Sequence, residues 1–327
     1  KVAHNWRMAH LYPLMRELIR LTRYSGVCGG GTTSGRIKQM SSIRKKLKRG
    51  SANLRGMQDL AGCRAIMDSP DGVQRILEKY RESHSHLIHR ETDYIEDPKP
   101  GGYRSAHIII TFEGGGKGIN YTGQKLEIQV RTKIQHVWAT AVEAVGFVRQ
   151  EDMKAGLGDA SWLRLMELMS AYLAEKEGLP VSSHVPKSRR ERADELRALE
   201  SDLSAIKNLE TYHGFMKIVE GQAGSYSGYY QLSLDTRTGS LSVMPRWTFA
   251  FSEAAHDVSF DDDDEKQDVM VSVTDLSSLR AAFPNYFYDV KLFLNYLTEA
   301  VKTDDKIATS FSGIDLSFLR GWGKGKR

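Results

Sequence analysis

Residues 125–132, KLEIQVRT, alternate apolar and polar side chains without a break. Successive side chains of a β-strand point to opposite faces, so one face of this stretch is apolar and the other carries Glu127, Gln129 and Arg131. Residues 107–112, HIIITF, form a second β-prone run, and the turn-rich segment between the two runs predicts a hairpin. The polar face of such a strand is a suitable floor for a binding site. A half-exposed edge strand without a site remains the alternative.

The remaining patterns of the first half predict further strands and helices. Residues 63–67, CRAIM, are typical of a buried strand, and the apolar spacing between Val73 and Tyr80 predicts one face of a helix. Helices are also predicted at residues 133–150, at residues 160–178, and, as one or two helices around Pro13, at residues 6–24. This mixture predicts an α+β (α/β) catalytic domain, in which a mixed β-sheet is flanked by helices.

Residues 25–35, SGVCGGGTTSG, are rich in glycine and are predicted to be a flexible connection. The run is not a phosphate-binding Walker A loop, because no Gly-Lys-Ser/Thr follows it. A plain mobile loop is therefore the favoured interpretation.

The character of the chain changes after residue 180. Residues 181–206 are highly charged, and Pro186 is predicted to begin a solvated linking helix. Beyond residue 207, alternating stretches predict a smaller β-rich domain, and residues 283–301 predict a final amphipathic helix. The predicted organisation is a catalytic domain at 1–180, a linking helix at 181–206 and a second domain at 207–327.

Composition narrows the class of protein. The chain has 327 residues, only two cysteines and a net charge of +5, with a sequence pI of about 9.0. Two cysteines provide no disulfide framework, so we expect a reducing compartment and a cytoplasmic protein. No apolar run is long enough to span a bilayer, so we expect no membrane association. The mild basic excess favours anionic partners without naming one.

The densest cluster of charge lies at residues 36–49, where seven of fourteen residues are basic and none is acidic. Arginine binds phosphate as a planar fork and lysine as a point charge, so this cluster suits a triphosphate. A nuclear-localisation-like run or a generic solvated face is an equally good interpretation of the cluster alone.

Two carboxylates are candidates for a metal site. Asp59 lies at the expected start of a strand, in MQDLAGCRAIM, where Gly62 allows close approach of the backbone and Arg64 follows. Asp59 and Glu127 together could hold Mg²⁺, which prefers oxygen ligands and keeps several waters. A lone Asp at this position is more often a cap or turn residue.

The segment DYIEDPKPGGYRSAH contains a tight loop of prolines and glycines that leads into the strand at residue 107. Tyr103 could stack on the base of an acceptor, a contact that contributes about 1–3 kcal/mol. Ordinary packing of Tyr103 at a strand end, and a structural role for His107, are the alternatives.

These segments, in this order, resemble the synthetase domain of RelA/SpoT proteins over about residues 1–180. The motifs that carry the resemblance are RIKQMSSIRKKLKR, DLAGCR, DYIEDPKPGGYRSAH, and EIQVRT followed by QHVWATAVE. The segments WRMAHLYPL and MQDLAGCRAI are most similar to those of toxic small alarmone synthetases, many of which pyrophosphorylate the 3′ CCA end of tRNA.

The resemblance implies a role for each matching position. Asp59 and Glu127 are implied to bind Mg²⁺, and Glu127 also to activate the attacking hydroxyl. The remaining roles are binding of ATP by Arg36, Lys38, Ser42, Lys46, Arg49 and Arg64, with Arg36 and Arg64 on either side of the adenine, and binding of the acceptor by Tyr103, His107, Gln129 and Arg131.

The region beyond residue 207 resembles the fused antitoxin part of CapRel-type toxin–antitoxin proteins, in which a pseudo-zinc-finger restrains the toxin and phage capsid protein is the trigger. The region contains no cysteine, which excludes a cysteine-based zinc site. The inhibitory Tyr-x-x-Tyr motif of that family corresponds to Phe283 and Tyr286, so its first tyrosine is a phenylalanine here. An aromatic cluster of this kind is equally well explained as part of a hydrophobic core.

Three functions follow from these patterns. The leading hypothesis is a toxin that transfers pyrophosphate from ATP to tRNA, contacts tRNA through Lys45, Lys48 and Arg55, is restrained by its own C-terminal domain and acts in phage defence. The second is an alarmone synthetase that makes ppGpp or ppApp from GTP, GDP or an adenine nucleotide. The third is a catalytically dead nucleotide or RNA sensor, which the presence of both Asp59 and Glu127 argues against. None of the three includes a DNA partner.

Overall fold

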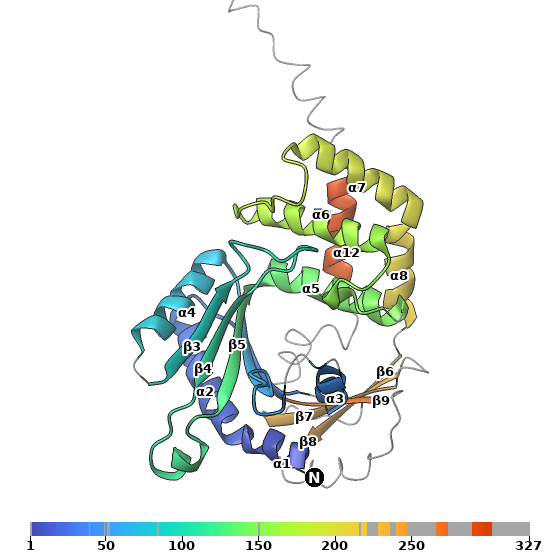
Figure 1. Cartoon of the computed structure of the whole chain (residues 1–327). Helices are drawn as coiled ribbons and strands as arrows, with labels where there is room; N and C mark the ends of the chain where they lie inside the picture. Colours follow the sequence, from blue (N-terminus) through green and yellow to red (C-terminus); the bar gives the residue numbers. More distant parts are fainter. Residues whose placement is uncertain are drawn as a thin grey trace, which may run out of the picture.

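The computed structural model describes residues 2–38, 40–48, 50, 53–83, 85–149, 151–215, 217–220, 228–235, 240–246, 266–273 and 290–302. Within these residues one sheet has nine strands in the order β3-β4-β5-β2-β1-β9-β7-β8-β6 (Figure 1). The strands are β1 (Gly31–Ile37), β2 (Ala61–Met67), β3 (Leu87–Asp93), β4 (Ala106–Thr111), β5 (Lys125–Thr132), β6 (Lys217–Glu220), β7 (Gly228–Asp235), β8 (Ser240–Arg246) and β9 (Lys266–Val273).

The helices fall into two groups. The first group packs on one face of the first five strands and consists of α2 (Leu11–Val27) and α4 (Pro70–Glu82), with α1 (Val2–Ala9) preceding α2. The second group forms a separate helical layer, drawn above the sheet in Figure 1. Its members are α5 (Lys133–Arg149), α6 (Ala160–Lys176), α7 (Arg189–Leu203), α8 (Ala205–Phe215) and α12 (Lys291–Lys302). The remaining described helices are α3 (Met40–Lys48), η1 (Gly116–Tyr121) and η2 (Met153–Ala155).

The first five strands form the mixed sheet that the sequence predicts. Strand β5 runs parallel to β2 and antiparallel to β4, and the predicted hairpin is confirmed by the pairing of His107 with Gln129. Apolar side chains from β2, β4 and β5 pack under α2 and α4, because alternation places them all on that face. The opposite face carries the polar side chains of the same strands. The predicted α+β fold class is confirmed.

The N-terminal prediction is also confirmed, since two helices flank the junction at His10. Pro13 lies in the first turn of α2, where the backbone N–H groups have no partner within the helix, so proline costs nothing there.

The prediction of a flexible connection at residues 25–35 is wrong. Helix α2 continues to Val27, a turn follows, and β1 begins at Gly31. The turn uses φ angles of +112° at Gly29 and +83° at Gly30, which only glycine adopts readily. Gly35 then lets α2 lie directly on β1, because a Cβ there would be 3.3 Å from the Leu14 side chain. The glycines serve a tight turn and close packing.

The helix within the charged segment at 181–206 is shorter and better packed than predicted. Its helix α7 begins after the cap at Ser188, whose hydroxyl accepts a hydrogen bond from the N–H of Glu191. One face of α7 is buried through Leu196, and Glu195 pairs with Arg164 of α6 at 2.6 Å. The helix therefore belongs to the helical layer, although its acidic and basic outer face is solvated as predicted.

The C-terminal region joins the rest of the molecule at two places. Strand β9 pairs with β1, with Val271 opposite Arg36, so β6 to β9 extend the sheet. Helix α12 inserts Phe293 and Leu297, both fully buried, into the core of the helical layer. The boundary predicted at residue 207 falls inside α8 and stays a prediction. No helix in the described part of the chain has the length and apolarity needed to cross a membrane.

Candidate active site

Two lysines, one just after β1 and one on α3, lie around a carboxylate in the segment before β2. Lys38 Nζ lies 2.8 Å from Oδ2 of Asp59, and Lys46 Nζ of α3 lies 3.1 Å from Oδ1. Burial opposes ionisation of Asp59, but the two ammonium groups outweigh it and hold the pKa of Asp59 below its ordinary value. Asp59 is therefore a carboxylate at neutral pH.

A second carboxylate lies on β5 and is held by an imidazole and an amide. Glu127 Oε1 lies 2.9 Å from His107 Nδ1, and Oε2 accepts from Gln129 Nε2 at 2.9 Å. Burial raises the pKa of Glu127, yet His107 and Gln129 stabilise the ionised form, and the pKa lies below its ordinary value. The other imidazole nitrogen of His107 lies 2.8 Å from Tyr103 Oη. With a neutral imidazole, Nδ1 donates to Glu127 and Nε2 accepts from Tyr103.

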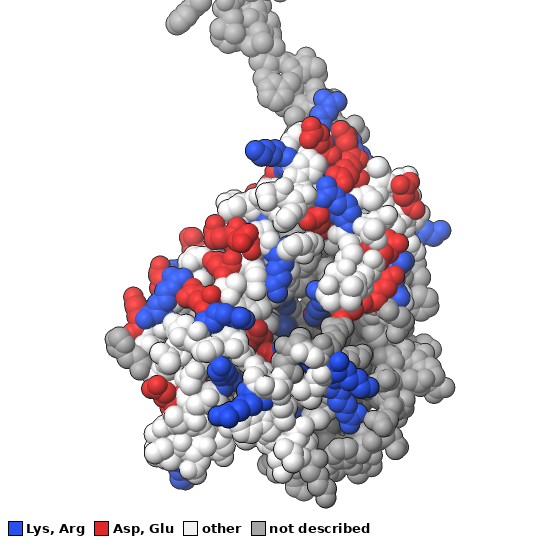
Figure 2. Space-filling view, viewed as in Figure 1, with Lys and Arg blue, Asp and Glu red and all other residues white. Residues whose placement is uncertain are grey.

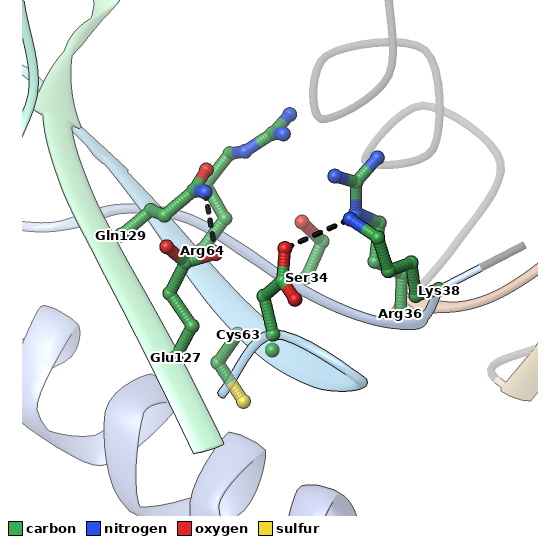
Figure 3. Close-up of a pocket in the computed structure, with 9 residues that line it drawn as sticks. Ser34, Arg36, Lys38, Cys63, Arg64, Glu127 and Gln129 are labelled. Carbon is green, nitrogen blue, oxygen red and sulfur yellow. Dashed lines mark hydrogen bonds and ion pairs between the residues drawn. The ribbon is translucent and has the colours of Figure 1, made fainter. Parts of the chain in front are cut away.

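The two carboxylates share one open pocket. Figure 3 shows Glu127 and Gln129 reaching in from β5, Arg64 from β2, and Arg36 and Lys38 from β1 on the other side. The lining consists of Ser34, Arg36, Lys38, Asp59, Gly62, Cys63, Arg64, Glu127 and Gln129. Gly62 allows this close arrangement, because a Cβ at that position would lie 2.8 Å from the carbonyl oxygen of Glu127.

The arginines of the pocket lie close enough to affect one another's ionisation. Removal from solvent, reinforced by Arg131 and Arg36, lowers the pKa of Arg64 to about 9. Glu143 of α5 opposes this effect, and it forms an ion pair with Lys154 of η2. Two or three guanidinium groups near one another are stabilised by an anion, so the pocket is electrostatically suited to phosphate.

The loop before β4 is fixed against the helical layer. Arg104 is buried and donates hydrogen bonds to the carbonyl oxygens of Ile95 (2.6 Å) and Pro180 (2.7 Å). Gly102 has a φ of +91°, and a Cβ there would lie 2.5 Å from the Ser170 side chain. Tyr103 is thereby held at the end of the loop, half-buried, with its ring centroid 6.0 Å from that of Tyr94.

The structure brings most of the predicted site residues together. The pocket contains Asp59 and Glu127 with Arg36, Lys38, Arg64 and Gln129; Lys46 contacts Asp59, and His107 and Tyr103 extend the site from Glu127. Ser42 lies half-buried on α3. Arg131 is buried, and its guanidinium contacts Nδ1 of His136.

Several predicted residues lie apart from the pocket or cannot be placed. Lys48 and Arg55 are exposed and do not line it. Arg49, Phe283 and Tyr286 lie outside the described residues, as does the side chain of Lys45. The roles assigned to all of these residues stay predictions.

Sequence reasoning missed four residues at or beside the site. Ser34 lines the pocket two positions before Arg36, and alternation would have identified it if β1 had been predicted. Glu143 lies in the segment QHVWATAVE, but nothing in the sequence links it to Arg64. Lys154, on a short 3-10 turn, gives no signal at all. The fourth is Arg7, which is 3% exposed and donates from Nε to the carbonyl oxygen of Lys38 at 2.7 Å.

Surface charge agrees with the geometry of the pocket. Figure 2 shows Lys and Arg side chains around the hollow at the centre of the view, whereas Asp and Glu gather mainly over the helices and the outer flank. An anionic ligand is therefore drawn towards the hollow.

Comparison with known proteins agrees with this arrangement. Residues 35–147, which run from β1 into α5, match the family model described as "Region found in RelA / SpoT proteins". This match marks residues 35–147 as a domain similar to that region. This domain is similar to the GTP pyrophosphokinase YwaC of Bacillus subtilis, with 29% identity over 154 residues that cover 44% of this chain and 70% of the relative. It is also similar to the GTP pyrophosphokinase YjbM of the same organism, with 31% identity over 120 residues that cover 35% of this chain and 55% of the relative.

Solved structures similar to part of this chain include the small alarmone synthetase 1 from Bacillus subtilis, with 20% identity and a TM-score of 0.45 over 54% of this chain and 92% of that one. The same protein bound to its product pppGpp gives 21% identity and a TM-score of 0.45, over 54% and 94% of the two chains. The sequence relatives support the enzyme class predicted from the motifs, a pyrophosphokinase of the RelA/SpoT type.

Proposed function

We propose that the synthetase domain transfers pyrophosphate from ATP to a ribose hydroxyl of a second nucleotide or of RNA. The observation that carries this proposal is the single pocket in which Asp59 and Glu127 lie together with Arg36, Lys38 and Arg64. The acceptor hydroxyl attacks the β-phosphorus of ATP, a new P–O bond forms, and the bond to the α,β-bridging oxygen breaks, so that AMP leaves. The hydroxyl proton passes to Glu127.

The residues of the pocket divide this work between them. Arg36 and Arg64 bind the adenine, and the lysines and arginines of the donor side bind the phosphates as charged hydrogen-bond donors. On the acceptor side Tyr103 stacks on the base, while Gln129 and His107 orient the carboxylate of Glu127. Phosphoryl chemistry depends mainly on such positioning and on stabilisation of charge.

The donor set of the pocket fits Mg²⁺. Asp59 and Glu127 supply two carboxylates, and the described residues contain no group of three or more His, Cys, Asp or Glu side chains that could enclose a metal by themselves. Mg²⁺ is commonly bound by one or two carboxylates, with waters and substrate phosphates completing its coordination. Asp59 and Glu127 would hold the ion, which neutralises charge on the phosphates when bound.

Two acceptors are supported by different observations. A guanine nucleotide is supported by the similarity to two GTP pyrophosphokinases. The 3′ end of tRNA is supported by the resemblance of the motifs to toxic synthetases and by the exposed Lys48 and Arg55, which lie outside the pocket and exceed what a triphosphate needs.

Incubation with γ-labelled ATP and either tRNA or GTP tests the proposal and separates the acceptors. We expect AMP and a labelled acceptor, with no product from Glu127→Gln. Release of ADP, or no transfer to either acceptor, would contradict pyrophosphate transfer. If tRNA is the acceptor, we expect Arg55→Glu to lower tRNA labelling steeply, with a larger loss at low salt than at high salt, and to leave ATP binding unchanged. Arg190→Glu on α7 is the control and is expected to have no effect on either quantity.

We further propose that the C-terminal region restrains the synthetase domain and that phage capsid protein releases it. This proposal is supported by the pairing of β9 with β1 beside Arg36 and by the burial of α12 in the helical layer. An aromatic ring can occupy a site between two guanidinium planes by cation–π stacking, which contributes about 0.5–2 kcal/mol.

The autoinhibition proposal is tested in the full chain, because removal of residues 207–327 would delete Phe293 and Leu297 from the core. Tyr286→Ala is expected to raise labelling of the acceptor, and added capsid protein is expected to stimulate the wild type more than the variant. A folded Tyr286→Ala protein with wild-type activity would exclude plugging by this ring.

A further inference from the structure

A second pocket, with a volume of about 300 Å³, lies on the other side of the sheet from Glu127. Its walls include Arg16, Arg20 and Arg23 of α2, together with Tyr12, Tyr24 and Phe112. Phe112 belongs to the core under α2, whereas Glu127 and Gln129 occupy the opposite face of the strands. This pocket, here called the back pocket, is therefore separate from the active site.

The three arginines form one stripe along α2. Their spacing of four and then three residues places them on the same side of the helix, one turn apart. Arg16 and Arg23 are exposed, and neither has an ion-pair partner among the described residues. Arg20 lies 3.9 Å from the carboxylate of the buried Glu17. The lining also includes one acidic residue, the exposed Glu113. Because this single carboxylate faces three arginines, the back pocket keeps an excess of positive charge.

Aromatic rings form the apolar part of the lining and are fixed by one another. The ring of Tyr12 stacks on Tyr121 with centroids 4.9 Å apart, and Phe112 meets Tyr12 edge to face at 6.3 Å. Tyr24 is held edge to face against Tyr80 at 5.3 Å. An aromatic ligand would find rings that do not need to be ordered on binding.

A buried polar network reaches the back pocket at His86. Glu17 is fully buried; its Oε1 accepts from Tyr80 Oη at 2.5 Å, and its Oε2 lies 3.1 Å from His86 Nε2. The other nitrogen of His86 accepts from the backbone N–H of Glu113 at 3.1 Å, which fixes the start of the glycine-rich loop. The His86 side chain is only 6% exposed although it lines the back pocket. None of these groups takes part in the proposed reaction.

We propose that the back pocket binds a free nucleotide, with its phosphates on the arginine stripe and its base against the aromatic wall. Guanidinium groups match phosphate as planar forks, and a base stacks on any aromatic ring. The volume lies at the lower end of the range of about 300–1,000 Å³ that is typical of small-molecule sites. The proposal does not depend on the proposed reaction, because it concerns different residues on a different face.

The test is the binding stoichiometry of α,β-methylene ATP, which cannot donate pyrophosphate, measured by isothermal titration. We expect two sites per chain in the wild type. Arg16→Ala with Arg23→Ala weakens one site at least tenfold, and Arg36→Ala with Arg64→Ala weakens the other. The matched control is Lys187→Ala with Arg190→Ala, which removes two exposed positive charges and leaves both sites intact.

The proposal would be overturned if every nucleotide site of the wild type were unchanged in the Arg16/Arg23 variant, or if a single-stranded RNA oligonucleotide bound to the stripe and the free nucleotide did not. If the Arg16/Arg23 variant does not fold, hydrogen exchange decides instead. In the Arg36/Arg64 variant, added nucleotide is expected to protect α2 and residues 113–118, and unchanged exchange there excludes the site.

Discussion

The two halves of the active-site pocket hold their carboxylates in different ways. On the donor side, Asp59 is paired with the ammonium groups of Lys38 and Lys46, whose side chains are 18% and 36% exposed. On the acceptor side, Glu127 is held by His107 and by an amide, in a chain of hydrogen bonds that ends at Tyr103.

The difference indicates separate tasks. Long, partly exposed lysines can exchange a carboxylate for incoming phosphate with little rearrangement, so Asp59 suits the management of charge. Glu127 is oriented by rigid neighbours on paired strands, and a fixed carboxylate suits removal of a proton from one defined hydroxyl. The following predictions test this division, from the largest expected effect to the smallest.

Glu127→Gln is expected to lower kcat by about 10³-fold or more, because an amide cannot accept the proton and general-base catalysis contributes about 10²–10⁴-fold. ATP affinity is expected to change by less than about threefold, because Arg36, Arg64 and Lys38, which are proposed to bind ATP, are unchanged. AMP release and nucleotide titration measure the two quantities. Turnover near that of the wild type would remove Glu127 from its assigned role.

Asp59→Asn is expected to reduce transfer by about 10²-fold, because the neutral amide cannot share in binding a divalent cation. The activity should partly return at higher Mg²⁺, which distinguishes this variant from Glu127→Gln. Rates measured across a Mg²⁺ series provide the test. An identical Mg²⁺ dependence in wild type and variant would contradict a metal role for Asp59.

Tyr103→Ala is expected to raise KM for the acceptor by about 10–100-fold, the equivalent of a stacking contribution of 1–3 kcal/mol, with little change in KM for ATP. Tyr103→Phe is the matched control, because it keeps the ring and removes only the hydroxyl that contacts His107. If the phenylalanine variant is as impaired as the alanine variant, the hydroxyl matters and stacking does not. A collapse of ATP binding would move Tyr103 to the donor side.

The smallest expected effect concerns acid stability. The folded protein holds the pKa of Asp59 below its ordinary value of about 3.9, so ionised Asp59 stabilises the fold above that pH. This contribution is expected to be lost as pH falls through the lowered pKa, and to be below about 1 kcal/mol because the lysines are partly exposed. Urea unfolding of wild type and Asp59→Asn should therefore differ at pH 7 and converge once the pH falls below the lowered pKa of Asp59. A difference that persists at low pH has another origin.

The sequence predicted those parts of the fold whose periodicity is strong. Alternation in KLEIQVRT placed Glu127 and Gln129 on the correct face, because a strand with a buried apolar side has only one such arrangement. The same alternation did not reveal that Arg131 is buried, since that depends on His136 and on the packing of α5.

Strand β1 could not be predicted in the same way. Its sequence, GTTSGRI, lacks an alternating apolar pattern, because Leu14 and Leu18 of α2 fill the space above Gly35 and supply the apolar surface. The basic cluster indicated a phosphate site, but it did not indicate that Lys38 and Lys46 pair with Asp59, which follows later in the sequence. Contacts such as that of Arg7 with the carbonyl oxygen of Lys38 follow from tertiary packing alone and leave no local pattern.

The pairing of β9 with β1 has a practical consequence for any shortened form of this chain. An uncovered strand edge presents a row of unsatisfied N–H and C=O groups that recruit a strand from another molecule. Without β9, that edge would be β1 itself, at Gly35 and Arg36. A truncated protein would then be expected to self-associate through the strand that carries Arg36, which is proposed to bind adenine. Its loss of activity would report aggregation at the site and would say nothing about regulation.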